Sequence, residues 1–134
     1  MKVLIDTNVI IDNLASRVPF DSDAKVIFNH IATNRIIGYV NISSITDIYY
    51  ILRKTFNNID SKEKIKTLMS LFEAIVVTKE DCFDALDSLV SDFEDALVVI
   101  CSEKEDLDLI ITRDLELLKI PKAISPSDFL GLLR

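Results

Sequence analysis

The chain has 134 residues, of which 49% are hydrophobic and 28% charged, and its formal net charge is −7. This length is typical of one domain, and the hydrophobic content is sufficient for a packed core, so residues 1–134 are expected to form a single folded domain. The sequence contains only 2 glycines and 3 prolines. That composition excludes a glycine-rich phosphate-binding loop and argues against an all-β protein with many tight turns.

The sequence shows no segment that would cross a membrane or direct export. Its longest apolar runs, such as residues 96–101, are far shorter than the ~20 residues of a membrane span, and no basic stretch precedes a long apolar one at the N-terminus. We therefore expect a cytoplasmic protein without membrane contact. The two cysteines, Cys82 and Cys101, are then expected to be reduced core thiols.

Short apolar runs alternate with segments of helical periodicity along the whole chain. The runs predict strands at Lys2–Asp6, Ile36–Asn41, Ala74–Thr78 and Leu107–Thr112, with a weaker one at Lys122–Ser125. Apolar residues spaced three to four apart predict helices at Ser22–Asn34, Ser44–Phe56, Ser61–Phe72, Glu80–Leu89 and Phe93–Glu105, and a terminal helix from Pro126. Nearly continuous apolar strands separated by helices are typical of a parallel sheet covered on both faces. We therefore predict an α/β fold, a three-layer α/β/α sandwich with a central parallel sheet of four to five strands.

Acidic residues gather where predicted strands end. Asp6 ends the first strand in the sequence L-I-D-T-N, and Asp114 follows the fourth in I-I-T-R-D, two residues after Thr112. The segment Ser91–Ala96 (S-D-F-E-D-A) opens the helix that precedes this fourth strand. Ligands of open parallel sheets bind outside the carboxyl ends of the strands, so these acids are expected to meet in one crevice.

Each acid also has a purely structural interpretation. Asp6 and Asp114 fit the N-cap of a following helical turn, and Asp92 with Asp95 three residues later resembles a capping box. Asp47, about one turn into the helix after the second strand, would balance a nearby basic residue on the helix surface. Independent caps have no reason to gather at one edge of a sheet, however, so their coincidence favours a functional site.

Four segments occur in the order and spacing of a known family. They are V-L-I-D-T-N-V-I-I-D at Val3–Asp12, S-S-I-T-D-I-Y-Y-I-L-R at Ser43–Arg53, D-F-E-D-A-L at Asp92–Leu97 and L-I-I-T-R-D at Leu109–Asp114. Through them the chain resembles the PIN domain family of metal-dependent ribonucleases over nearly its whole length. Its size is similar to that of the stand-alone VapC-type toxins of this family.

The resemblance implies which residues form the site. The family's four acids fall on Asp6, Asp47, Asp95 and Asp114, which are the expected catalytic residues, and Asp6, Asp95 and Asp114 are the expected metal ligands. Asp47 stands where the family usually has a glutamate, one methylene longer, and is expected to complete the ligand shell or orient the attacking water. The expected substrate-binding or supporting residues are Asn8, Thr112 and Arg113.

Chemistry explains why such an acidic cluster needs a cation. Several carboxylates within a few ångströms cannot all stay ionised without one, because like charges raise each other's pKa. Oxygen ligands suit Mg²⁺ or Mn²⁺, and the single histidine, His30, lies on a predicted helix away from these acids, which argues against zinc. The expected reaction is phosphodiester hydrolysis, in which the metal polarises the scissile phosphate.

Basic and apolar residues suggest the partners. The negative net charge has the wrong sign for binding RNA by charge alone, so an RNA substrate requires a local, salt-sensitive grip. The basic residues available to flank the site are Arg17, Arg35, Arg53, Lys54, Lys62, Lys64 and Lys66, although Lys62–Lys66 fit a solvated surface equally well. Residues 15–28 and 49–56 carry more apolar side chains than a solvated face needs, which fits a homodimer or a partner groove. The family resemblance implies a small antitoxin in such a groove, and hence the toxin of a type II toxin–antitoxin pair.

Two other acid-dependent protein classes require residues that this chain lacks. An aspartyl phosphatase needs a second acid two residues after Asp6, where this chain has Asn8. A response-regulator receiver needs a phosphoacceptor after the third strand, where Val76–Lys79 offers none. A non-catalytic or weakly active PIN-like module that binds RNA or protein stays open, because Asp47 replaces the usual glutamate.

Overall fold

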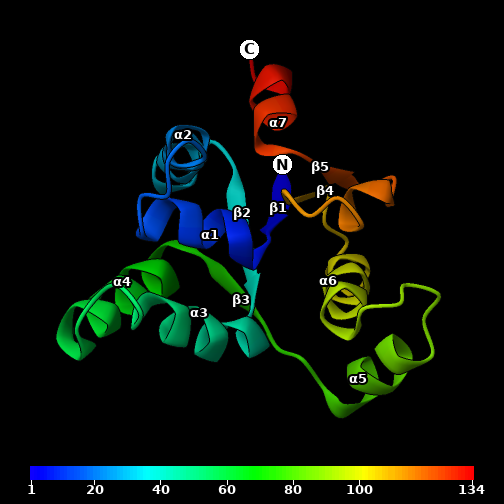
Figure 1. Cartoon of the computed structure of the whole chain (residues 1–134). Coiled ribbons are helices and arrows are strands. Elements are labelled where there is room, and N and C mark those ends of the chain that lie inside the picture. Colours follow the sequence, from blue (N-terminus) through cyan, green and yellow to red (C-terminus); the bar gives the residue numbers. More distant parts are fainter.

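The computed structural model describes residues 1–134 and has a parallel sheet at its centre (Figure 1). The sheet has five strands in the order β3-β2-β1-β4-β5, so the chain begins in its middle. The strands are β1 (Lys2–Ile5), β2 (Ile37–Asn41), β3 (Glu73–Ile75), β4 (Leu109–Ile111) and β5 (Ala123–Ile124), and all adjacent pairs are parallel. The predicted α/β class with a parallel sheet is confirmed.

Helices cover both faces of this sheet. They are α1 (Thr7–Leu14), α2 (Asp21–Ala32), α3 (Ile45–Leu52), α4 (Asn58–Leu71), α5 (Lys79–Leu86), α6 (Phe93–Lys104) and α7 (Pro126–Leu132), with short 3-10 turns η1 (Ile42–Ser44) and η2 (Leu117–Lys119). The larger core joins the sheet to α1, α2, α3, α4 and α7, whereas α6 packs on the opposite face and α5 packs on α6 (Figure 1). No helix is both long and apolar enough to cross a membrane.

The alternation of side chains along β1 shows why its residues Val3–Ile5 are all apolar. Val3 and Ile5 point into the larger core, and Leu4 points into the smaller core beside Cys101 of α6. Burial on both faces is the property that makes a parallel strand apolar at every position. Cys101 is buried, Cys82 is half-buried, and both thiols are free.

One helix was not predicted. α1 begins directly after β1, and Val9, Ile10, Ile11 and Asp12 are all buried. Four consecutive buried residues have no helical apolar period, so the helix cannot be recognised as amphipathic from the sequence. The structure explains this burial, because α1 is packed against α2 and α3 as well as against the sheet.

The strand register sets the position of the site. Ile5 of β1 lies beside Ile111 of β4, and the backbone N–H of Asp6 donates to the carbonyl of Ile111 at 2.9 Å. The next residues of the two strands, Asp6 and Thr112, therefore emerge together at the carboxyl edge of the sheet. This is the edge at which open α/β sheets bind their ligands.

Candidate active site

Asp6 is the N-cap of α1 and the most buried acid of the cluster, with 9% of its surface exposed. Its Oδ1 accepts the N–H of Thr7 at 2.9 Å, and its Oδ2 accepts the hydroxyl of Thr112 at 2.7 Å. Burial raises the pKa of Asp6, hydrogen bonds from Thr112 and Thr7 oppose this rise, and the charges of Asp114 and Asp92 add to it. Asp6 is thus both a helix cap and a member of a shared electrostatic site.

Asp114 follows the end of β4 closely, and hydrogen bonds to its side chain and from its backbone hold it in place. Its Oδ1 accepts the N–H groups of Glu116 at 2.8 Å and of Leu117 at 3.1 Å, and its own N–H donates to the Thr112 hydroxyl at 3.0 Å. The Thr112 hydroxyl therefore links the two strand-end acids, since it donates to Asp6 and accepts from the backbone of Asp114.

The start of α6 brings further acids to the same place. The side chain of Asp92 accepts the N–H of Asp95 at 3.0 Å, which confirms Asp92 as the N-cap of this helix. Burial raises the pKa of Asp95 to about 6, with further contributions from the charges of Asp114, Asp92, Asp6 and Glu94. These neighbouring charges come from three separate elements, so Asp95 is electrostatically part of the site formed by the strand ends.

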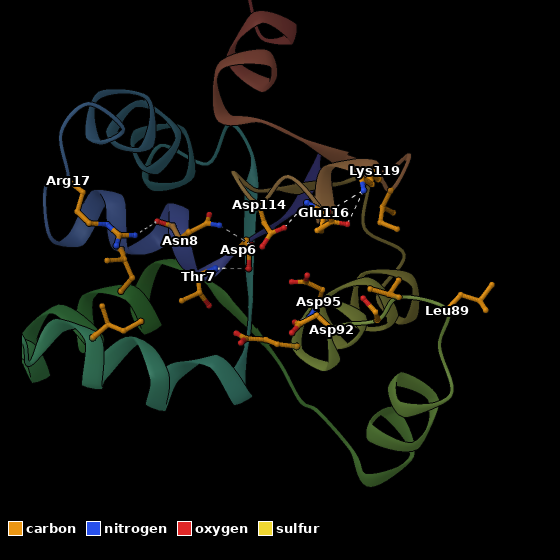
Figure 2. A pocket seen from close by; sticks show the side chains of 16 residues that line it. Asp6, Thr7, Asn8, Arg17, Leu89, Asp92, Asp95, Asp114, Glu116 and Lys119 are labelled. Atoms are coloured by element: carbon orange, nitrogen blue, oxygen red, sulfur yellow. Dashed lines mark hydrogen bonds and ion pairs between the residues drawn. The ribbon is translucent and has the colours of Figure 1, made fainter.

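An open pocket of about 820 Å³ joins these residues (Figure 2). Its acidic lining residues are Asp6, Asp92, Glu94, Asp95, Asp114 and Glu116, and its basic ones are Arg17 and Lys119. In Figure 2 the strand-end acids Asp6 and Asp114 face Asp92 and Asp95 at the start of α6 across the pocket, and Arg17 lies near the C-terminal end of α1. The structure thus places the predicted Asp6, Asp95 and Asp114 around one cavity.

Asp47 lies at the margin of this site. It lines a neighbouring pocket of about 260 Å³ with Thr7, Lys54 and Glu94, and Thr7 and Glu94 also line the main pocket. The pKa of Glu94 is raised by burial first and then by the charges of Asp47, Asp6 and Asp92. Asp47 therefore does not line the main pocket itself but borders the adjoining one together with Glu94, which lines both. The sequence pattern assigns no role to Glu94.

The expected supporting residues Asn8 and Arg113 differ in position, because Asn8 lines the pocket and Arg113 does not. The Nδ2 of Asn8 donates to Asp6 Oδ2 at 3.4 Å, and its Oδ1 accepts the backbone N–H of Arg113 at 3.4 Å. The guanidinium of Arg113 turns away from the pocket and pairs with Asp12, with Nε at 2.6 Å from Oδ2 and Nη2 at 3.0 Å from Oδ1. It also stacks on Phe20, 3.7 Å from the ring centre.

Asp12 is the second residue that sequence reasoning missed. Its side chain is 1% exposed and also pairs with Arg17, whose Nε lies 3.1 Å from Oδ1. The one available signal was an acid directly after the apolar run V-I-I, where a buried charge requires cationic partners. Sequence alone could not identify those partners, because Arg113 is 101 residues away in the chain.

The donor chemistry of the pocket fits an oxygen-preferring divalent cation. Carboxylates are the only common metal-binding side chains among its lining residues, and their charges add to the rise that burial causes in the pKa values of Asp6 and Asp95. Such mutual repulsion is what a divalent cation relieves. No three of these carboxylates lie close enough together to form a complete set of metal ligands.

Comparison with known proteins places the chain in a family. A family model described as PIN domain matches residues 2–116, which is most of the chain. The protein therefore belongs to the PIN domain family, and the resemblance recognised in its motifs is confirmed. A search of curated proteins found no match.

Solved structures share the fold at low sequence identity. Mycobacterium tuberculosis VapC20, described as a sarcin-ricin loop cleaving toxin, has a TM-score of 0.71 at 13% identity over 87% of this chain and 93% of its own. A toxin–antitoxin complex from Klebsiella pneumoniae gives a TM-score of 0.70 at 18% identity, over 92% of this chain and 97% of its own. VapBC2 from Rickettsia felis, bound to a promoter DNA fragment, gives a TM-score of 0.63 at 12% identity, over 93% of this chain and 97% of its own. These likenesses confirm the PIN-like three-layer fold.

Proposed function

We propose that this protein is a metal-dependent endoribonuclease that hydrolyses phosphodiester bonds of RNA. The observation that carries the proposal is the gathering of Asp6, Asp95 and Asp114 around one open pocket at the carboxyl edge of the sheet. Membership of the PIN domain family and the fold shared with a toxin described as cleaving the sarcin-ricin loop support RNA as the substrate.

The proposed ligands of the cation are Asp6, Asp95 and Asp114. When bound, Mg²⁺ or Mn²⁺ would neutralise charge developing on the scissile phosphate and favour loss of a proton from the attacking water. In this hydrolysis the water oxygen bonds to phosphorus, and the bond from phosphorus to the leaving ribose oxygen breaks. Thr112 holds Asp6 and the Asp114 backbone in place, so that two ligands keep one spacing.

Asp47 and Glu94 are proposed as outer acids. Both border the pocket that adjoins the main one, and Glu94 borders both pockets. Glu94 can therefore supply the longer side chain that the family usually carries at the position of Asp47. In this proposal the two residues orient water or complete the ligand shell.

Cleavage of a mixed pool of structured and single-stranded RNA tests the proposal. Wild type, Asp6→Asn and the control Asp84→Asn are compared in Mg²⁺, in Mn²⁺ and in EDTA, with circular dichroism to verify folding. Asp84 is an exposed acid outside the main pocket, so this variant repeats the charge change alone. We expect cleavage by wild type and Asp84→Asn, and none by Asp6→Asn or in EDTA. RNA or protein binding by folded wild type without any cleavage would favour the non-catalytic module instead.

We further propose that the protein acts in the cytoplasm as the toxin of a type II toxin–antitoxin pair and forms a homodimer. Two of the similar structures are described as a toxin–antitoxin complex and as VapBC2, which supports a small antitoxin partner. Val18, Phe20 and Tyr50 are exposed apolar side chains within the two segments expected to form interfaces. Light scattering of the purified protein, alone and co-expressed with the product of an adjacent small gene, would test both; a monomer that captures no such product would contradict them.

A further inference from the structure

The two basic residues that line the pocket differ in how their charge is balanced. Lys119, one of its two basic residues, has its ammonium 3.0 Å and 3.2 Å from the two carboxylate oxygens of Glu116, so its charge is neutralised locally. Arg17, the other, shares the carboxylate of Asp12 with Arg113. Two guanidinium groups on one carboxylate leave one positive charge in excess beside an otherwise acidic pocket.

Arg17 is held along one edge of its guanidinium. Its Nε donates to Asp12 at 3.1 Å and its Nη2 donates to the carbonyl of Asn8 at 3.1 Å. Asp12 is 1% exposed, so this anchor is fixed within the protein, whereas the Arg17 side chain is 43% exposed. The Nη1 group takes part in neither contact and is available as a donor, and Arg17 lines the pocket.

Arg113 cannot play the same part. Its guanidinium donates twice to Asp12, is stacked on Phe20 and does not line the pocket. Arg113 instead neutralises Asp12 and thereby leaves Arg17 free to offer its charge outward. Of the two arginines on this carboxylate, only Arg17 faces a space large enough for a ligand.

We propose that Arg17 binds a phosphate of the RNA strand next to the scissile phosphate. This inference rests on the proposed ribonuclease function and names a substrate-binding residue for it. A guanidinium fixed on one edge presents its remaining N–H groups to phosphate oxygens with little loss of conformational entropy. Asn8 lies between Arg17 and Asp6, because its carbonyl accepts from Arg17 Nη2 and its side-chain amide donates to Asp6 Oδ2. The contact therefore falls on a neighbouring phosphate rather than on the reacting one.

Binding of RNA at several salt concentrations tests this role. A fluorescein-labelled pool of mixed-sequence single-stranded RNA suffices as the probe, because a phosphate contact does not depend on base sequence. All proteins carry Asp6→Asn, so that the RNA stays intact in Mg²⁺, and the added changes are Arg17→Met, Arg17→Gln and, as the control, Arg35→Met. Arg35 is exposed and lies outside the pocket, so its change removes the same charge elsewhere. Thermal melting verifies that each variant folds, and Arg17→Gln keeps a donor for Asp12 if Arg17→Met does not.

We expect the Arg17 variants to bind RNA about tenfold more weakly than their parent. The salt slope of log affinity should also become shallower by about 0.7 for the loss of one phosphate contact on a single strand. Arg35→Met should change neither value. Equal affinities and slopes for the folded Arg17 and Arg35 variants would overturn the inference while leaving the ribonuclease proposal intact. If the parent binds no RNA and wild type cleaves none, the proposed function fails and takes this inference with it.

Discussion

The hydroxyl of Thr112 donates to Asp6 Oδ2 at 2.7 Å and links the end of β4 to the end of β1 at the carboxyl edge of the sheet. The same oxygen accepts the N–H of Asp114 at 3.0 Å. Thr112 is fully buried, so water cannot replace these bonds if the hydroxyl is lost. One buried atom therefore sets the spacing of two of the three proposed metal ligands.

Replacement of Thr112 by valine should weaken both the fold and cation binding. The change keeps the shape of the side chain but leaves the N–H of Asp114 without a partner and Asp6 Oδ2 with only the 3.4 Å bond from Asn8, which costs about 1–3 kcal/mol of the free energy of unfolding. It also removes the larger of the two hydrogen-bond effects that oppose the burial-induced rise in the pKa of Asp6, so this carboxyl should release its proton less readily. Urea denaturation and Mg²⁺ titration measure the two effects. Thr112→Ser, which keeps the hydroxyl, should recover most of both, and a valine variant with wild-type values would contradict this role.

Asp12 should be among the residues on which folding depends most. Its buried carboxylate accepts from Arg17 and Arg113, so Asp12→Asn would leave two guanidinium groups without a counter-charge. Because both arginines are partly exposed, we expect a loss of about 2 kcal/mol, below the 3–5 kcal/mol typical of fully buried pairs. Chemical denaturation against Asp84→Asn, an exposed acid, checks this value. Equal stability of the two variants would show that the arginines find other partners at no cost.

Thr112 and Asp12 illustrate what the sequence could and could not predict. The strand-end acids were predictable, because β1 and β4 are continuous apolar runs and the topology rule places their carboxyl ends at one edge. Thr112 was placed correctly at that edge for the same reason. The direction of the Arg113 side chain was not predictable, since it depends on Phe20 and Asp12 packing beside it.

The sequence pattern fails to predict helix α1 for a similar reason. Residues 9–12 of α1 are buried on every side, so their pattern resembles a strand run more than an amphipathic helix. The capping residues carried more information than the apolar pattern here. The sequence around Asp6 fits the N-cap of a helical turn, and Asp6 does cap α1.

Asp81 should contribute stability that depends on pH. It lies in the capping box of α5, and its Oδ2 is 2.6 Å from the ammonium of Lys104 on α6. The bond from Lys104 first, and then the N–H of Thr78, lower the pKa of Asp81 below its ordinary value of 3.8. A carboxyl with a lowered folded-state pKa stabilises the protein above the ordinary value, and this contribution is lost as pH falls through the folded-state pKa.

Asp81→Asn should therefore lower the free energy of unfolding at neutral pH by about 1–2 kcal/mol. The difference from wild type should shrink in strong acid, where Asp81 is protonated in both states of the wild-type protein. Urea denaturation at neutral and acidic pH measures this dependence. Asp84→Asn on the same helix serves as the control and should show little effect at either pH. A deficit for Asp81→Asn that stayed constant down to strong acid would assign the effect to packing rather than to charge.

The pH dependence of stability that comes from Asp95 should have the opposite sign, because burial of its charge among other carboxylates opposes folding when no cation is bound. Its folded-state pKa of about 6 lies above the ordinary 3.8. The folded protein thus holds this proton more tightly than the unfolded chain, and stability falls as pH rises from the ordinary value to the folded-state one. Removing the charge with Asp95→Asn should stabilise the metal-free protein at neutral pH. Since the side chain is only half-buried, we expect a gain of about 1 kcal/mol after solvent screening.

Asp128→Asn provides a matched control for this last variant. Asp128 occupies the same third position of α7 that Asp95 occupies in α6, but it lies outside the pocket, so its loss removes only a favourable interaction with the helix dipole. In EDTA at neutral pH, Asp95→Asn should melt above wild type and Asp128→Asn slightly below it. Added Mg²⁺ should raise the melting temperature of wild type and Asp128→Asn but not of Asp95→Asn, because only a folded state that binds the ion gains from it. A pair of variants that shift together would remove Asp95 from the proposed metal site, whereas opposite shifts would show that the repulsion opposing folding comes from the same charge that binds the cation.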